Sequence, residues 1–104
     1  MFGTVAKMTL KPGSMEKMRS LREQQQARGV KGFRFSAVFQ SKSDPNETWL
    51  VVGFDDEASY RANAEDPETN KMAEQMRVLM AAPSEWHDGE IVNMRTSDEG
   101  THTG

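Results

Sequence analysis

The segment TWLVVGF, residues 48–54, constrains the fold more than any other part of this chain, because it is apolar on both faces of a strand. Alternate residues of an extended chain face opposite ways, so Trp49 and Val51 share one face and Leu50 and Val52 share the other. A strand of this kind is covered on both faces in a folded protein. The chain must therefore place a layer of structure on each side of its sheet, or recruit one.

Two further segments alternate between apolar and polar residues in the manner of strands. Residues 2–10 and 32–40 show the pattern, and in the second of these Phe33 and Phe35 are predicted to share one face. The loop SKSDPNE that follows is rich in turn-forming residues and leads into the apolar strand, which predicts an antiparallel hairpin. Residues 89–95, GEIVNMR, are predicted to form a last short strand.

Helical segments are predicted between these strands. Ser14 is an N-cap residue and Gly29 is a good C-terminal cap, so a first helix is expected between them. A second helical segment starts after Asp56 and is interrupted at Asp66-Pro67, where an N-cap residue is again followed by proline at the first helical position. The interruption either bends the helix around a curved sheet or lines a ligand pocket.

Beyond the interruption, Met72 and Met76 begin an apolar stripe that is predicted to continue the helix as far as Met80. The element order is then β-α-β-β-α-β, which predicts an α+β ferredoxin-like fold with a four-stranded antiparallel sheet and both helices on one face. A homodimer formed sheet against sheet would cover the other face. Residues 1–95 are expected to form one domain, and the polar tail 96–104 is expected to be disordered.

Composition and charge disfavour several classes of function. The net charge of −3 argues against nucleic acid as the main partner, and the absence of cysteine excludes disulfides and thiolate metal sites. The first residues lack the features of a signal peptide, and no apolar run approaches the roughly 18 residues that a membrane helix needs. A cytoplasmic protein without membrane contact is expected. Residues 1–34 carry eight basic groups against two acids, so the first helix either is a solvated surface or attracts an anionic ligand or a second subunit.

The hairpin and the segment FDDEASYRANAEDPE after it resemble the antibiotic biosynthesis monooxygenase family. The residues at matching places are Trp49, Phe54, Glu57, Ala58, Tyr60 and Pro67. The resemblance spans about residues 2–95, and it implies the dimeric α/β barrel fold. Members of the family include cofactor-free oxygenases of aromatic polyketides, quinol oxygenases, haem-degrading enzymes, signal-molecule processing enzymes and proteins without a known reaction.

The chain departs from the family pattern where many members carry histidine. Asn63 stands where a first histidine is common, and Asp66-Pro67-Glu68 replaces a Ser-Pro-His motif. Asparagine can neither ligate haem iron nor act as a base, although it donates and accepts hydrogen bonds. Haem degradation in the family also uses an asparagine in the first strand and a histidine on the second helix, and this chain has neither. Haem chemistry is therefore disfavoured.

Three residues are candidates for catalysis. Tyr60 could donate its hydroxyl to a substrate oxygen, Asn63 could anchor a substrate through its amide, and His87 could act as a base or a donor at a pocket rim. Each has a structural alternative. Tyr60 would cover a helix end, Asn63 would lie on a helix surface, and His87 would belong to a surface loop beside Asp88.

Five residues are candidates for substrate binding: Arg34, Phe35, Trp49, Met72 and Met76. Trp49 would form the wall of an aromatic pocket with Phe35, Arg34 would pair with a carboxylate or enolate, and the two methionines would give a flexible lining. The structural alternatives are that Trp49 belongs to the core or to an interface, that Arg34 is an exposed strand residue, and that the methionines belong to the helix core.

Two functions from different classes are compatible with these residues. The first is a monooxygenase that needs no cofactor and acts on a small aromatic or quinol-type substrate in a cavity between sheet and helices, where hydrogen bonds stabilise the substrate anion. The second is a non-catalytic dimeric barrel that binds a small ligand in a stress or regulatory role. The family resemblance favours the first, and the missing histidines favour the second or an unusual member of the first.

Overall fold

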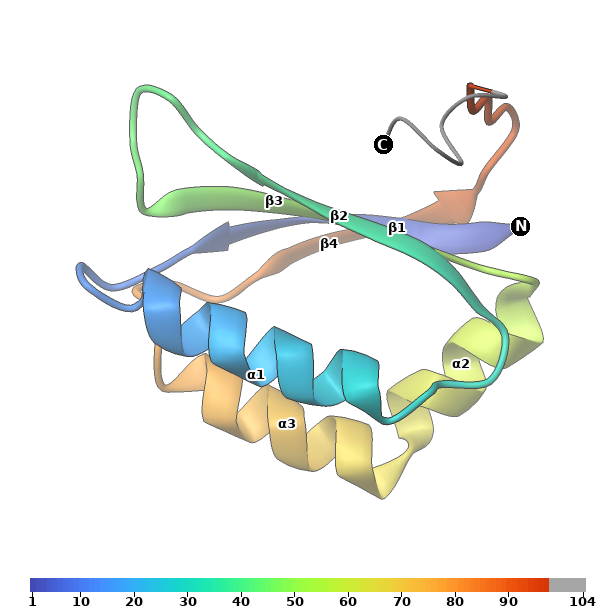
Figure 1. Ribbon diagram of the computed structural model, residues 1–104, viewed down its shortest axis with the longest axis horizontal. Helices are drawn as coiled ribbons and strands as arrows, with labels where there is room; N and C mark the ends of the chain where they lie inside the picture. The colour runs from blue at the N-terminus through green and yellow to red at the C-terminus, as the bar shows by residue number, and fades with distance from the viewer. Residues whose placement is uncertain (98–104) are drawn as a thin grey trace.

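The computed structural model describes residues 1–97, apart from the side chain of Gln26. Within these residues the strands and helices are β1 (Phe2–Thr9), α1 (Met15–Ala27), β2 (Phe33–Gln40), β3 (Glu47–Phe54), α2 (Glu57–Glu65), α3 (Pro67–Arg77) and β4 (Glu85–Glu90) (Figure 1). The order β-α-β-β-α-α-β confirms the ferredoxin-like α+β fold, with the second helical segment divided in two. Of the tail expected to be disordered, residues 98–104 lie outside the described residues.

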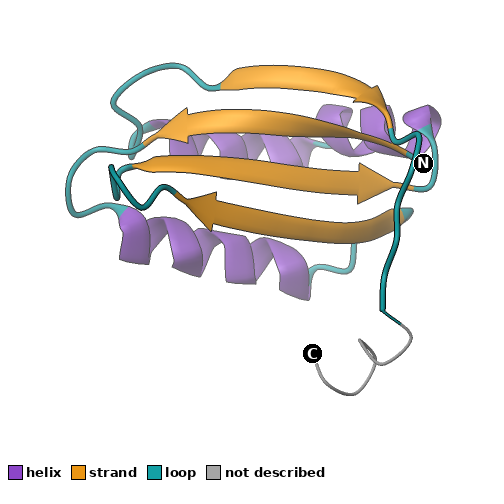
Figure 2. Ribbon diagram, turned by 90° about the horizontal axis from the view of Figure 1, so that it is seen from above, coloured by secondary structure: helices purple, strands orange, loops and turns teal. Residues whose placement is uncertain are grey.

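The strands form a four-stranded antiparallel sheet in the order β2-β3-β1-β4. β1 lies at the centre, with Phe2 opposite Phe54 of β3 on one side and Glu90 of β4 on the other. The three helices of the described chain lie on one face of this sheet, which we call the helix face, and the opposite, open face has no helical cover (Figure 1, Figure 2). None of these helices has the length and apolar character of a membrane span.

The alternation predicted for β1 and β3 is confirmed, and it places the core on the helix face. Ala6, Met8 and Leu50 are buried there and pack against Met80. On the open face Trp49 is only half-buried. The strand that is apolar on both faces is therefore covered by helices on one face alone.

The predicted face of Phe33 is wrong, because β2 contains a bulge or irregularity between Phe33 and Phe35. An extra residue of this kind reverses the faces of the side chains on either side of it. Phe33 lies opposite Phe54 on the helix face, where the two ring centroids are 6.0 Å apart in an edge-to-face contact. Phe35 lies on the open face opposite Gly53, and its ring occupies the space that a side chain at Gly53 would need.

The last strand lies at Glu85–Glu90 and not at the predicted residues 89–95. β4 pairs with β1, and its last residue already lies opposite Phe2. The backbone N–H of Ile91 donates to the carbonyl of Met1 at 2.8 Å, where the chain of β1 begins. The apolar residues that follow have a strand-like pattern, but β1 offers them no further residue to pair with.

Capping explains why the second helical segment is divided. Asp56 Oδ1 accepts a hydrogen bond from the backbone N–H of Ser59 at 2.8 Å and starts α2. Asp66 Oδ1 accepts from the backbone N–H of Glu68, also at 2.8 Å, and starts α3 with Pro67 in its first turn. The predicted restart at Asp66-Pro67 is therefore confirmed, and it rests on local hydrogen bonds.

The end of α3 lies earlier than predicted, at Arg77 and not at Met80. The backbone after it bonds to the end of β1, where the N–H of Ala81 donates to the carbonyl of Thr9 at 2.8 Å. Met80 lies opposite Leu10 in an isolated bridge and still packs against the core. Pairing with β1 has thus replaced the last predicted turn of the helix.

Replacing Asp66 with alanine removes the side chain that caps α3. We expect Asp66→Ala to lower the free energy of unfolding by about 1 kcal/mol, measured by urea denaturation. The adjacent Glu65→Ala is the control, because it removes an exposed carboxylate but no cap, and it is expected to stay within about 0.5 kcal/mol of the wild type. Equal stability of the two variants would contradict the capping account.

Candidate functional site

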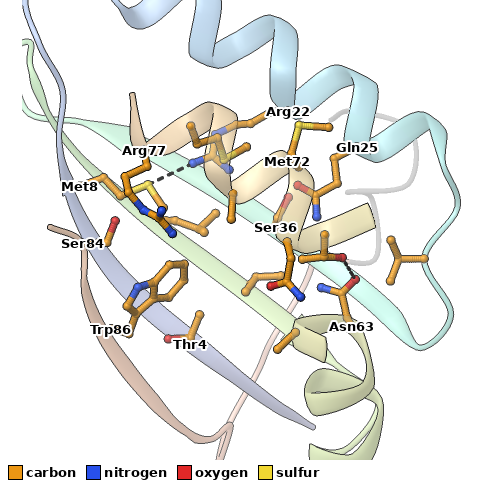
Figure 3. A pocket seen from close by; sticks show the side chains of 18 of the residues that line it. Thr4, Met8, Arg22, Gln25, Ser36, Asn63, Met72, Arg77, Ser84 and Trp86 are labelled. Carbon is orange, nitrogen blue, oxygen red and sulfur yellow. Dashed lines mark hydrogen bonds between the residues drawn. The ribbon is translucent and has the colours of Figure 1, made fainter. Parts of the chain in front are cut away.

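A cavity of about 1010 Å³ lies between the helix face of the sheet and the helices (Figure 3). Neither α2 nor α3 contains a buried residue, so these helices cover the sheet without filling the space beneath them. Protein interiors are otherwise close-packed, and cavities of about 300–1,000 Å³ are typical of small-molecule sites. This cavity is therefore the candidate functional site.

Apolar and small side chains form most of the cavity wall, and its charged groups are all positive. Arg22 of α1 and Arg77 of α3 line it, whereas no aspartate, glutamate, histidine or lysine of the described chain does. Within residues 1–97 no group of three or more histidine, cysteine, aspartate or glutamate side chains is placed to hold a metal ion. The polar groups of the lining are two arginines, which only donate hydrogen bonds, and amide and hydroxyl groups, which donate and accept them.

Aromatic rings form one end of the cavity. Tyr60 of α2 packs against Phe54 of β3 with a centroid separation of 5.7 Å and against Phe2 of β1 with one of 5.3 Å. Phe33 packs against the other side of Phe54. Trp86 of β4 also lines the cavity (Figure 3). Together these rings provide flat surfaces against which a planar ligand can stack.

The hydroxyl of Tyr60 is committed to a protein partner. It donates to Asp88 Oδ1 at 2.8 Å, a bond that joins α2 to β4. Partial burial raises the pKa of Tyr60, the hydrogen bond to Asp88 raises it further, and the neighbouring Thr4 hydroxyl opposes part of the rise. The phenol is therefore protonated at neutral pH. Tyr60 supplies an aromatic wall and not a base.

Asn63 presents its amide nitrogen to the cavity. Arg28 donates to Thr69 Oγ1 at 3.1 Å, and the Thr69 hydroxyl donates to Asn63 Oδ1 at 3.0 Å, so the amide is held in one orientation. Among the described residues Nδ2 has no hydrogen-bond partner, and both of its protons are available to a ligand. Thr4 Oγ1 is buried at the same cavity and makes no well-formed hydrogen bond within residues 1–97.

Half of the predicted site residues line this cavity: Tyr60, Asn63, Met72 and Met76. Tyr60 and Asn63 lie one turn apart on α2, and the two methionines lie one turn apart on α3. The break between α2 and α3 therefore brings two helical segments to the same cavity. Of the two explanations left open for this break, the pocket-lining one has direct support.

The other predicted site residues lie outside the cavity. Trp49 and Phe35 are on the open face, where Trp49 Nε1 donates to Glu47 Oε2 at 3.0 Å. His87 belongs to β4 and not to a loop, and its place opposite Val5 puts it on the open face as well. Arg34 lies in the irregular part of β2.

Arg34 also has a partner in the structure. Its Nη1 forms an exposed ion pair with Asp55 Oδ1 at 3.0 Å. This contact joins β2 to the loop that precedes α2, and it corresponds to the structural alternative of an exposed strand arginine. An ion pair of this kind contributes little to stability.

Most of the lining residues are not among the predicted site residues, and three of these are Trp86, Thr4 and Arg22. Trp86 is missed because the last strand is predicted too late, and its correct register puts Trp86 on the helix face and the adjacent His87 on the open face. Arg22 follows Met18 by four residues and so continues the apolar stripe of the first helix. Arg19 follows Met15 by the same spacing and is exposed, so spacing alone does not separate Arg22 from the exposed basic residues.

The sequence profile of the antibiotic biosynthesis monooxygenase family matches residues 1–75. The chain belongs to this family. The match runs from β1 into α3, so it includes Tyr60 and Asn63 but not Trp86. A search of the curated proteins found no match.

Solved structures of this fold resemble the chain at low sequence identity. SnoaB, a cofactor-independent oxygenase from Streptomyces nogalater solved in a mutant form, matches with a TM-score of 0.78 and 16% identity over 89% of this chain and 94% of that one. Rv0793 from Mycobacterium tuberculosis gives a TM-score of 0.75 and 14% identity over 91% of this chain and 98% of that one. A conserved protein from Methanosarcina mazei Go1 gives a TM-score of 0.75 and 16% identity over 85% of this chain and 89% of that one. Identities this low establish a shared fold and no shared substrate.

Tyr60 is the single tyrosine of the chain, so its ionisation can be followed by ultraviolet absorbance. We expect it to ionise above its ordinary pKa, because burial and Asp88 both favour the neutral phenol. A raised pKa in the folded state means that this group stabilises the fold fully below about pH 10, and that the contribution is lost as the pH rises through the folded pKa.

Two variants separate the causes of this raised pKa. Asp88→Asn removes the charge beside the phenol and is expected to lower the pKa of Tyr60 toward its ordinary value. Glu85→Gln, on the open face of the same strand, is expected to leave that pKa unchanged. An ordinary or lowered pKa in the wild type, or equal effects of the two variants, would contradict this description of the site.

Proposed function

We propose that this chain is a monooxygenase that oxidises a small phenolic or quinol-type molecule with O₂, without a cofactor, in the cavity between sheet and helices. The observation that carries the proposal is a cavity of ligand size that combines aromatic walls at Tyr60 and Trp86 with the free amide N–H groups of Asn63. Membership of the antibiotic biosynthesis monooxygenase family supports the reaction class.

In this reaction the substrate supplies the electrons. Ground-state O₂ reacts slowly with closed-shell molecules, but a phenolate can transfer one electron to it, and the two radicals then combine at a ring carbon that carries hydrogen. The resulting peroxide takes up a proton and loses water. One phenol and one O₂ thus give one quinone and one water: one oxygen atom becomes the new carbonyl, and the other leaves with two hydrogens.

The protein stabilises the substrate anion in this scheme. Nδ2 of Asn63 donates to the phenolate oxygen, and in a cavity with apolar walls such a hydrogen bond is stronger than in water. No carboxylate, histidine or lysine of the described chain lines the cavity, so the phenolic proton passes to water and not to a side chain. Substrates that ionise near neutral pH are therefore favoured.

The same absence of a base favours one alternative, a protein that binds a small aromatic ligand without turnover. Binding needs the aromatic walls and the donors, but it needs no proton transfer and no O₂. The two functions therefore differ in a single observable, the consumption of O₂ in the presence of ligand.

A second copy of the chain is the partner that the open face fits. Phe39 is 64% exposed there and lies opposite the half-buried Trp49, and Val5 is 40% exposed and lies opposite Val51. Gly3 lies opposite Gly89, and the Phe35 ring lies over Gly53 on the other side of Gly3, so the apolar surface of this face includes that ring. A two-fold pairing of open faces buries this apolar surface on both copies.

Asn63→Ala removes the amide donor and is expected to reduce O₂ uptake with 1,4-naphthohydroquinone by about 100-fold, as loss of one anion-stabilising donor typically does. The protein is treated with a chelator, and uptake is measured above the spontaneous rate. Asn46→Ala, in the loop between β2 and β3, is the control and is expected to keep the wild-type rate. Wild-type uptake no faster than the spontaneous rate for a panel of quinols and polyphenols would contradict the oxygenase and favour the binding protein.

Phe39→Asp places a charge in the proposed dimer surface and is expected to convert a dimer into a monomer at micromolar concentration, measured by size-exclusion chromatography with light scattering. Val78→Asp is the matched control, because Val78 is 67% exposed but lies at the end of α3, away from the sheet. A monomeric wild type, or dissociation caused equally by both substitutions, would contradict pairing through the open face.

A further inference from the structure

The cavity contains a positive charge that has no counterion in the described chain. Nη2 of Arg22 donates to Met8 Sδ at 3.4 Å, and thioether sulfur is a weak acceptor. No carboxylate within residues 1–97 forms an ion pair with Arg22, whereas the other lining arginine, Arg77, is paired with Glu74 at 2.8 Å. Arg22 is therefore the unpaired cation of the cavity.

This placement of Arg22 has an energetic cost. Burial lowers the pKa of its guanidinium, because the charged form has lost contact with water. An arginine on a helix can usually extend its long side chain and keep the charged end in solvent. Here the guanidinium lies over Met8 inside the cavity (Figure 3). An anionic ligand would supply the missing partner and offset the cost.

Arg22 lies at the opposite end of the cavity from the rings of Phe2, Phe54 and Tyr60. Met8, which Arg22 contacts, is four residues along β1 from Thr4, or about 13 Å at 3.3 Å per residue. Figure 3 shows Arg22 and Met8 on one side of the cavity and Asn63 on the other. The amide of Gln25, three residues after Arg22 on α1, is directed into the space between them (Figure 3).

We propose that the substrate is an aromatic carboxylate, whose carboxylate is bound by Arg22 with Gln25 as a further donor while its ring lies toward Tyr60 and Asn63. The planar guanidinium matches a carboxylate in shape and can donate two parallel hydrogen bonds to it. The absence of acidic residues from the described lining removes the competitor for that cation. The inference rests on the proposed function for the oxidation of this molecule, but its binding can be tested alone.

The test compares two ligands that differ in charge and hardly in shape, 2-naphthoate and 2-naphthamide. Neither carries a phenolic hydroxyl, so neither is oxidised by the proposed reaction. We expect the wild type to bind 2-naphthoate at least about tenfold more tightly than 2-naphthamide in isothermal titration calorimetry, because the carboxylate alone forms a charge-assisted pair with Arg22.

Arg22→Met is the informative variant, because methionine is unbranched and suits the surroundings of Met8 and Met18. It is expected to abolish the preference for naphthoate and to keep the affinity for naphthamide within about twofold, since a neutral amide gains little from the cation. The melting temperature of Arg22→Met is expected to equal or exceed that of the wild type, since an unpaired buried charge has been removed. Arg19→Met, which removes an exposed arginine paired with Glu16, is the control and is expected to keep the preference.

Three results would overturn the inference: equal affinity of the wild type for both ligands, binding of neither, or a preference that survives in Arg22→Met. Because no O₂ takes part, the outcome is independent of the proposed oxidation. Quinol oxidation without a preference for naphthoate would remove the carboxylate site and leave the oxygenase. A preference for naphthoate in a protein that oxidises no quinol would support the carboxylate site in a ligand-binding protein.

Discussion

Both faces of β3 are apolar, and the arrangement of the other elements follows from the need to cover them. On the helix face, α1 contributes the buried Met18, while α2 and α3 contribute no buried residue and α2 touches the sheet through the ring of Tyr60. The space beneath these helices is the cavity. On the open face the chain provides no helix, and the exposed Phe39 and half-buried Trp49 are the surface that we assign to a second copy. One strand thus connects the candidate site on one side with the candidate interface on the other.

The break between α2 and α3 links the local sequence to the site. Asp56 and Asp66 fix the start of each helix through backbone N–H groups, and the change of direction between them lets Tyr60 and Met72 line one cavity from different helices. The hydrogen bond from Tyr60 to Asp88 then fastens α2 to β4. The cavity has donors at Asn63 and at Arg22 and no carboxylate of the described chain in its lining, and this is why both proposals concern an anion.

Local chemistry in the sequence was enough to predict the order of elements along the chain, the hairpin and the restart at Asp66, because caps, turns and alternation depend on residues close together in the chain. The errors come from contacts between distant segments. The face of Phe33 depends on a one-residue irregularity in β2, and the position of β4 depends on where β1 runs out of residues to pair with. The register of β4 in turn decides that Trp86, and not His87, reaches the cavity. Arg22 is recognisable as a site residue only once Met8 lies beneath it.

The two tryptophans of the chain can report whether a ligand binds on the helix face, because Trp86 lines the cavity and Trp49 lies on the open face. Their indole N–H signals can be followed separately in a ¹H–¹⁵N spectrum and assigned with Trp49→Phe. Ring currents of a bound aromatic molecule act over short distances, so titration with 2-naphthoate should shift the Trp86 signal and leave the Trp49 signal in place. A shift confined to Trp49, or no shift of Trp86 at saturation, would place the ligand outside the cavity and contradict the account.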